Sequence, residues 1–116
     1  MIRKGTETEA ERFPSCHGGV GEVLCHSMLK QGESQFGICF FHHDTLAPGV
    51  SIGEHLHSGS EEIYYLLSGS CTLLFDGGAS EMHAGDFSIV GVGHTHGIVN
   101  SSNDTAELIV VGVVDR

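Results

Sequence analysis

Short β-forming segments separated by turn residues run through most of the chain, and they limit its fold more than any other feature. From Val20 onward, stretches rich in Val, Ile, Phe, Tyr and Thr alternate with clusters of Gly, Asn, Asp and Ser. The 17 glycines against 2 prolines favour many tight turns. Strands are predicted over residues 20–29, 36–46, 50–57, 62–68, 70–75, 79–83, 86–91, 96–100 and 105–114. This spacing predicts an all-β, antiparallel barrel or jelly roll.

The chain is long enough for one hydrophobic core but not for two, since it has 116 residues. No polar linker divides it. Residues 1–19 are interpreted as a polar N-terminal arm and residues 20–116 as a single barrel domain. Within the arm, only Thr6 to Arg12 has much helix-forming character. Because that stretch has no apolar face to bury, a stable helix is not expected there.

The charge balance excludes several classes of partner. Only 5 Lys and Arg stand against 15 Asp and Glu, for a formal net charge of −10. Nucleic acid and anionic membrane surfaces are therefore not expected partners. The longest apolar stretch, residues 108–114, is far shorter than the roughly 20 residues that span a bilayer. The N-terminus lacks the apolar segment of a secretory signal, so a cytoplasmic location is expected.

The four cysteines are expected to be free thiols. They show no CxxC pair of the kind that binds zinc or carries out redox chemistry. A reducing cytoplasm would keep them reduced. They are Cys16, Cys25, Cys39 and Cys71.

Two segments are apolar at consecutive positions, where a sheet with one solvated face would alternate. These are residues 63–67, of sequence IYYLL, and residues 108–114, of sequence LIVVGVV. Strands that are apolar on both faces are usually covered on both. A chain this small has few layers to supply that cover, so a partner subunit, and hence a homodimer, is predicted. The alternative is that the N-terminal arm covers one face.

Histidine placement points to a metal site. His55 and His57 are two positions apart, which on a strand puts both imidazoles on one face. Glu62 follows beyond the turn at residues 58–60, where an antiparallel neighbour can return a carboxylate to that face. His96 lies in a second glycine-rich β segment. A His-x-His pair alone is more often a surface coincidence, and the wider spacing is what makes this one informative.

That wider spacing resembles the two signature motifs of the cupin superfamily. They are written here as Gly49-x5-His55-x-His57-x4-Glu62-x6-Gly69 and Gly85-x5-Gly91-x-Gly93-x2-His96-x3-Asn100. The one departure is Gly91, where the family usually has proline. The 15 residues between the motifs, 70–84, match the short spacing of small single-domain bacterial cupins. The segments PGVSIGEHLHSGSEEIYYLLSGS, MIRKGTE and GGVGEV are similar to short, mostly uncharacterised cupin-2 proteins.

The resemblance implies a double-stranded β-helix with a metal ion inside, held by His55, His57, Glu62 and His96. Three imidazoles and one carboxylate suit one divalent transition metal per chain: Fe, Mn, Co, Ni, Cu or Zn. Around an octahedral ion, two positions stay open for water, oxygen or a bidentate substrate. Glycine in place of proline at position 91 removes a rigid turn residue, which is expected to affect the order of the loop before His96 more than ligation.

Three further side chains are candidates for catalysis, each with a structural alternative. His42 and its neighbour His43 lie on one strand, so one of them faces inward and could contact substrate or simply be hydrogen-bonded. His94 precedes ligand His96 and either gates the pocket or is exposed. Tyr64 shares the face of Glu62, where it could exchange a proton or pack in the core. His17, His26 and His83 are interpreted as structural or surface residues.

No Lys or Arg occurs between Lys30 and Asp115, so the predicted barrel carries no permanent cation except the metal. Cupins that act on sugar phosphates or oxalate generally use a basic side chain to hold the anion. These two substrate classes are therefore less favoured, unless Arg12 or Lys30 reaches the site. A neutral or metal-chelating small molecule fits better.

Three functions remain open at this stage. The first is a small metalloenzyme, with dioxygenase-like cleavage ahead of lyase or isomerase chemistry. The second is a non-catalytic module in which the metal holds a small effector or stabilises the barrel. The third, a structural cupin without metal, is disfavoured because all four ligand positions carry the right residue types.

Overall fold

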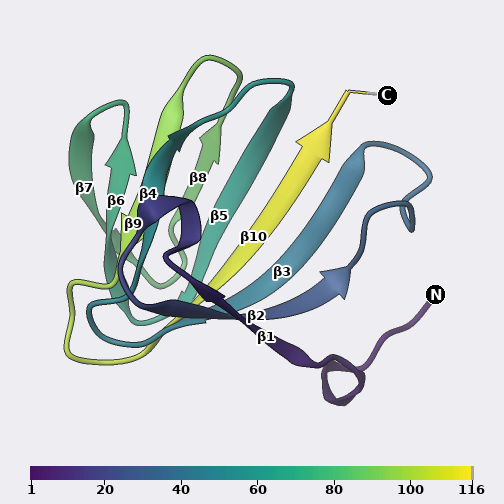
Figure 1. The fold of residues 1–116 in the computed structure, drawn as a ribbon, viewed down its shortest axis with the longest axis horizontal. Helices are drawn as coiled ribbons and strands as arrows, with labels where there is room; N and C mark the ends of the chain where they lie inside the picture. The colour runs from purple at the N-terminus through teal and green to yellow at the C-terminus, as the bar shows by residue number, and fades with distance from the viewer. Residues whose placement is uncertain (116) are drawn as a thin grey trace.

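The computed structural model describes residues 1–115, which form ten β-strands and two short 3₁₀ helices (Figure 1). The 3₁₀ helices are η1 (Gly5–Glu7) and η2 (Cys16–Gly18). In chain order the strands are β1 (Ala10–Pro14), β2 (Glu22–Leu29), β3 (Ile38–Leu46), β4 (Ser51–Leu56), β5 (Ser60–Ser68), β6 (Ser70–Phe75), β7 (Gly78–His83), β8 (Phe87–Val90), β9 (Thr95–Val99) and β10 (Ala106–Val114).

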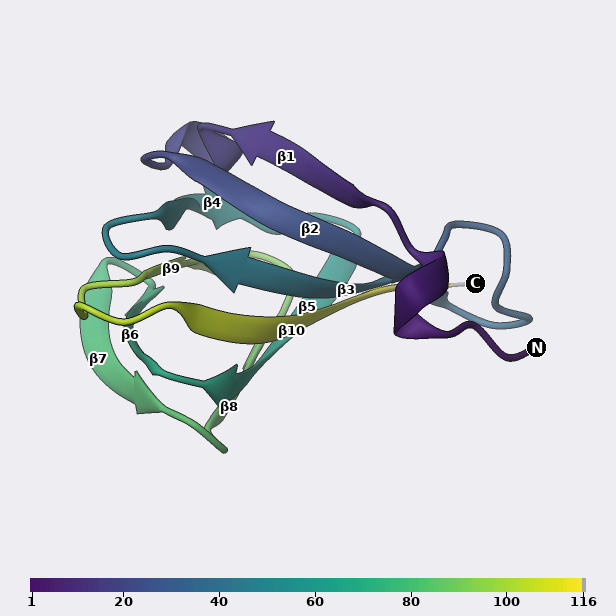
Figure 2. The ribbon, with the colours of Figure 1, turned by 90° about the horizontal axis from the view of Figure 1, so that it is seen from below.

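The strands form two antiparallel sheets that pack around one core (Figures 1 and 2). The six-stranded sheet has the order β1-β2-β3-β10-β5-β8, and the four-stranded sheet has the order β4-β9-β6-β7. Strands that are neighbours in a sheet are mostly distant in sequence, as in β3 and β10. This is the all-β, antiparallel jelly-roll arrangement that the sequence predicts.

All nine predicted strands are present, with ends that differ by at most two residues from the predicted ones. The core draws apolar side chains from both sheets. It is made of Val23, Leu46, Val50, Ile52, Tyr64, Leu66, Cys71, Met82, Ile98, Ala106, Leu108 and Val110. The alternation of turn and strand residues therefore predicted the fold correctly.

A tenth strand, β1, lies inside the segment that was interpreted as a polar arm. Ala10 pairs with His26, and the pairing continues to Pro14 opposite Glu22. All five residues of β1 are exposed, so no apolar alternation marked them as a strand. Pro14, which cannot donate a backbone hydrogen bond, is tolerated because β1 is the edge of its sheet.

The apolar segment at residues 108–114 forms β10, which lies between β3 and β5. Leu108 and Val110 are buried against the core, whereas Ile109 and Val111 point the other way and are only half-buried. The strand is therefore apolar on both faces, as predicted, and one of these faces is not fully covered by the described chain.

Within residues 1–115, no helix has the length and apolar character needed to cross a membrane. All four cysteines are free thiols, as predicted. Cys25 and Cys71 are buried, and Cys16 and Cys39 are partly exposed.

Candidate metal centre

Two adjacent strands of the four-stranded sheet and one strand of the other sheet bring the four predicted ligands together. His55 on β4 lies directly opposite His96 on β9 in the strand register. Glu62 reaches the same point from β5, which lies between β10 and β8 in the six-stranded sheet. One ligand atom from each of His55, His57, Glu62 and His96 lies within 4.8 Å of the others.

The nitrogen atoms of the three imidazoles converge. His57 Nε2 lies 3.1 Å from His55 Nε2 and 3.0 Å from His96 Nε2. Two ligands at right angles on an ion with bonds of about 2.1 Å are separated by about 3 Å. The Glu62 carboxylate adds oxygens at 3.6 Å from His57 Nε2 and 3.4 Å from His96 Nε2. The donor set and its spacing therefore fit a single divalent transition metal ion.

The hydrogen bond made by the other ring nitrogen fixes the tautomer of His55. His55 Nδ1 lies 2.7 Å from the Gly53 carbonyl oxygen. Because a carbonyl can only accept, Nδ1 carries the proton and the Nε2 lone pair of a neutral ring points into the cluster. His57 Nδ1 lies 3.2 Å from Ser60 Oγ. His96 Nδ1 is buried and has no hydrogen-bond partner among residues 1–115.

Glycines let the backbone approach closely beside the ligands. A Cβ on Gly97, next to His96, would lie 2.7 Å from the Ile52 carbonyl oxygen. A Cβ on Gly53 would lie 2.1 Å from the His17 carbonyl oxygen, where η2 packs against β4. The pairing of β4 with β9 is irregular between Ile52 and His55. Only glycine leaves room for this contact between the two ligand-bearing strands.

Burial favours the neutral form of two of the ligand imidazoles. It lowers the pKa of His55 and of His57 below the usual value of 6.5. The charge of Glu62 acts in the opposite direction on both rings, with the smaller effect. Both imidazoles are therefore neutral near pH 7, which is the form that binds a metal ion.

A cavity of about 500 Å³ opens onto the cluster. His55, His57 and Glu62 line it, while His96 is fully buried behind them. No Lys or Arg of the described residues 1–115 lines this cavity. Arg12 is exposed and lies 3.7 Å from Glu22, so it does not supply the missing cation.

Only His42 of the three predicted catalytic residues lines the cavity. It is half-buried and stacks on Phe40, with ring centroids 4.5 Å apart. Burial lowers its pKa, so the imidazole is neutral near pH 7.

Tyr64 and His94, for which the sequence left a catalytic and a structural role open, are not among the residues that line the cavity. Tyr64 is fully buried and stacks on His96, with ring centroids 4.2 Å apart and planes inclined by 9°. Tyr64 shares the face of Glu62, but the ring of His96 covers it. His94 is exposed, and its Nδ1 lies 2.7 Å from Asp76 Oδ2 on the outside of the loop.

Hydrogen bonds hold the loop before His96, in which glycine occupies position 91. His57 N donates to the His94 carbonyl oxygen, and Gly93 N donates to the His57 carbonyl oxygen. Thr95 N donates to Asp76 Oδ1 at 3.0 Å. These bonds hold the loop to the residue that follows β4 and to the turn after β6.

Several cavity residues were not identified as site residues from the sequence. His17, interpreted as structural or surface, lines the cavity and stacks on His55 with ring centroids 3.7 Å apart. Cys16, Cys25 and Asp44 also line it. His17 and Cys16 come from η2, and no motif spacing linked that segment to the ligands. The inward alternation of β3 was a usable signal for Asp44, because it is two residues from His42.

Comparison with known proteins agrees with this geometry. The family model of Cupin_2, described as a cupin domain, matches residues 42–112. The sequence is 32% identical over 111 residues to an oxalate-binding protein from Thermotoga maritima, covering 96% of this chain and 92% of that protein.

Two solved structures extend the similarity to the fold. The crystal structure of a predicted oxalate decarboxylase from Thermotoga maritima has a TM-score of 0.94 and 32% identity, covering 98% of this chain and 99% of that one. A Cupin 2 conserved barrel domain protein from Salinispora arenicola has a TM-score of 0.68 and 26% identity, covering 78% and 75% of the two chains. The chain therefore belongs to the Cupin_2 family of cupin-domain proteins.

Proposed function

We propose that the protein holds one divalent transition metal ion through His55, His57, Glu62 and His96, and uses it to bind a small molecule. The observation that carries this proposal is the convergence of three Nε2 atoms with a carboxylate at one end of the cavity. When bound, the ion would supply a Lewis-acidic centre with open coordination positions. The cavity walls would exclude bulk water from that centre and limit ligand size.

The ligand class that fits best is a small oxygen chelator with two adjacent oxygens. In the part of the cavity wall formed by residues 1–115 there is no Lys or Arg, so the ion itself must balance any ligand charge. Oxalate is such a chelator. The missing basic side chain made it less favoured from the sequence, but the name of the similar Thermotoga maritima protein, an oxalate-binding protein, supports including it. Sugar phosphates have no cationic partner here and are not proposed.

Titration calorimetry on the metal-loaded protein tests this ligand class. Oxalate, an α-hydroxy acid and a vicinal diol are compared with acetate, which cannot chelate through two adjacent groups. We expect heat for at least one chelator, no heat for acetate, and no heat for any ligand with His57→Ala protein. Equal binding of acetate and oxalate, or binding by the metal-free protein, would contradict the proposal.

Catalysis is a second candidate function, with oxygenase chemistry ahead of lyase or isomerase chemistry. It is favoured by His42, whose neutral imidazole lines the same cavity as the metal cluster and could accept a proton. Oxygen uptake and product formation by protein loaded with Fe(II), Mn or Ni would test this candidate. If the protein binds a chelator but shows no turnover with any of these metals, catalysis is excluded and only the binding function remains.

We further propose that two chains associate through the outer face of the six-stranded sheet. This face is defined by Ile63, Tyr65, Leu67, Phe87, Ile89, Ile109 and Val111. Its members are neighbours in the register, as Tyr65 lies opposite both Phe87 and Ile109. Phe87 is 58% exposed and Leu67 is 44% exposed. A second copy would remove this contiguous apolar surface from water.

A cytoplasmic location is proposed on the basis of the four free thiols, which a reducing compartment preserves. The net charge of −10 favours a small-molecule ligand over nucleic acid.

A further inference from the structure

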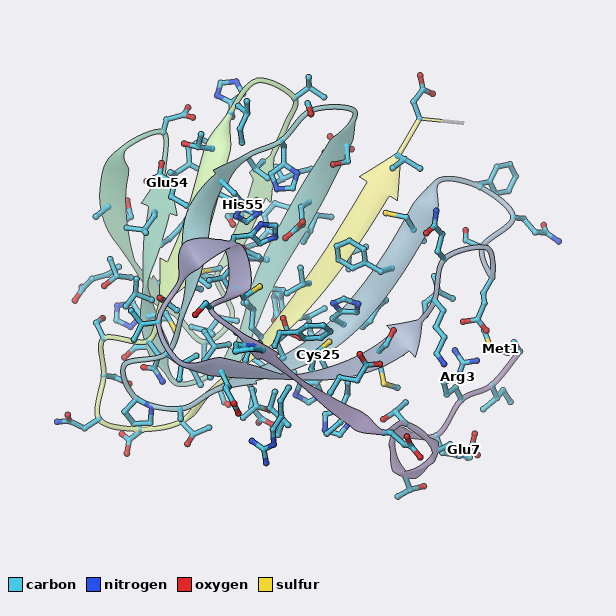
Figure 3. The ribbon with its side chains drawn as sticks, viewed as in Figure 1. Met1, Arg3, Glu7, Cys25, Glu54 and His55 are labelled. Carbon is cyan, nitrogen blue, oxygen red and sulfur yellow. The ribbon has the colours of Figure 1, made fainter. Side chains whose placement is uncertain are left out.

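The cavity contains a second cluster of ligating side chains, on the inner face of the six-stranded sheet. Cys25 on β2 lies directly opposite Asp44 on β3, and His42 lies two positions from Asp44 along the same strand. The alternation of a strand puts all three side chains on one face. One ligand atom from each of the three lies within 4.8 Å of the others. Figure 3 labels Cys25 and His55, which mark the second and first clusters on β2 and β4.

We propose that Cys25, His42 and Asp44 form a second metal site, specific for a thiophilic divalent ion such as Zn²⁺. Thiolate, imidazole and carboxylate are all zinc ligands, with bonds of about 2.0 to 2.3 Å. Three protein ligands leave the fourth tetrahedral position open toward the cavity. This site is separate from the cluster of His55, His57, Glu62 and His96, and it does not depend on the function proposed for that cluster.

Asp44 gives an independent reason to place an ion here. It is 5% exposed, and its Oδ1 atom is buried without a hydrogen-bond partner in the described chain. A buried carboxylate oxygen without a partner costs free energy that a bound cation recovers. No Lys or Arg lines this cavity among residues 1–115, so a side-chain cation does not serve that purpose.

His42 is free to bind. Neither of its ring nitrogens makes a hydrogen bond within the described residues, and its ring is held by stacking on Phe40. Burial keeps it neutral near pH 7 by lowering its pKa. With an ion bound, His42 would be unavailable as a proton acceptor, so the second site and a proton-transfer role for His42 exclude each other.

Cys25 would make the second site selective for thiophilic ions over ions that prefer oxygen ligands. Its thiol is buried and paired with the Asp44 carboxyl group, and burial raises its pKa. Binding of the ion breaks the S–H bond, releases the proton to solvent and forms a metal–sulfur bond, without any change in oxidation state. The thiolate and the Asp44 carboxylate together balance the charge of a divalent ion. Oxygen-preferring ions such as Mg²⁺ and Ca²⁺ have little affinity for sulfur and should be rejected.

Zinc stoichiometry after chelator treatment and reloading gives the first test. Wild-type protein is expected to bind about two Zn²⁺ per chain, and Cys25→Ser and Asp44→Asn proteins about one. His57→Ala protein, which lacks the first site, should keep about one. If wild-type protein binds one ion and His57→Ala protein binds none, the second site does not exist and the first stands. If His57→Ala changes nothing while Cys25→Ser removes an ion, the first site fails and the second stands.

Substitution of Co²⁺ identifies the sulfur ligand directly. A sulfur-to-cobalt charge-transfer band in the near ultraviolet is expected in the wild-type and His57→Ala proteins and should be absent from Cys25→Ser. Cys16→Ser is the matched control, because Cys16 lines the same cavity but is not part of the cluster. A band that is lost in Cys16→Ser and kept in Cys25→Ser would overturn the assignment. Circular dichroism confirms that each variant is folded, and His42→Ala replaces any variant that is not.

Discussion

The imidazoles of His57 and His96 approach to 3.0 Å between their Nε2 atoms, although 39 positions separate the two residues in the sequence. Adjacent strands β4 and β9 bring them together, and the Glu62 carboxylate lies close to both nitrogens. Three ring nitrogens and a carboxylate are therefore directed at one point, where a single cation would satisfy all four. The predictions below follow from that arrangement and from the cavity beside it.

Substitution of Gly97 should weaken metal binding through the backbone. A Cβ in Gly97→Ala would lie 2.7 Å from the Ile52 carbonyl oxygen, so β9 must move away from β4. We expect a loss of stability on the order of 1–3 kcal/mol and weaker Zn²⁺ binding, measured by chemical denaturation and titration calorimetry. Gly91→Ala is the control, because no atom of the described residues lies within 4 Å of its Cβ position. A Gly97→Ala protein with wild-type stability and affinity would disprove the close approach.

Metal retention at the first site should depend on pH in a stated direction. Protonated imidazole cannot bind a metal ion, so affinity falls as pH drops. Because burial lowers the pKa of His55 and His57, their neutral forms persist below the usual value of 6.5. Equilibrium dialysis should therefore show that the metal is retained at pH 6.5 and lost only at a lower pH, with protons released on binding. Retention that is flat from pH 8 to pH 4.5 would argue against histidine ligands.

Substitution of His17 tests whether a side chain that only contacts a metal-binding residue affects the affinity for the metal ion. Its ring stacks on His55 but does not belong to the cluster of converging atoms. His17→Ala should keep the bound ion, with affinity reduced less than tenfold, whereas His57→Ala should lose the ion at the first site. Elemental analysis of both variants after dialysis makes the comparison. Complete loss of metal in His17→Ala would mean that His17 is itself a ligand.

Asp44 should destabilise the metal-free protein at neutral pH. Burial raises its pKa from 3.8 to about 6, so the folded state holds the proton more tightly than the unfolded state. Relative stability therefore falls as pH rises from about 4 to about 6, and the cost levels off at about 3 kcal/mol above that range. Metal-free Asp44→Asn protein should exceed wild type in unfolding free energy at pH 7.5 and equal it near pH 4. A variant less stable than wild type at pH 7.5 would contradict this account.

The outer face of the six-stranded sheet should control association. Phe87→Glu places a charge on the apolar surface formed by β5, β8 and β10, at its β8 edge. Sedimentation equilibrium should show a dimer for wild type and a monomer for this variant. Phe36→Glu is the matched control, since Phe36 is 79% exposed in the loop between β2 and β3. A wild-type monomer, or dissociation by Phe36→Glu instead, would exclude this interface.

The sequence predicted most of the fold because the relevant signals are local. Alternation of apolar residues and turn-forming glycines predicted nine strands, and the exposed strand β1 was missed because it has no alternation. The i, i+2 spacing of His55 and His57, together with the two motifs, predicted a cluster of four ligands. The same four side chains lie close together in the structure. What could not be predicted depends on packing between distant segments. Examples are the burial of Tyr64 behind His96 and the approach of His17 to His55.

The central claim is a metal ion held by His55, His57, Glu62 and His96. The most direct test is elemental analysis of protein purified without chelator or histidine tag, compared with a His55→Ala/His96→Ala variant shown by circular dichroism to be folded. Wild-type protein is predicted to carry about one more transition metal ion per chain than the variant. Equal metal content in the two proteins, even after reconstitution with Fe, Mn, Ni, Cu or Zn, would contradict the account.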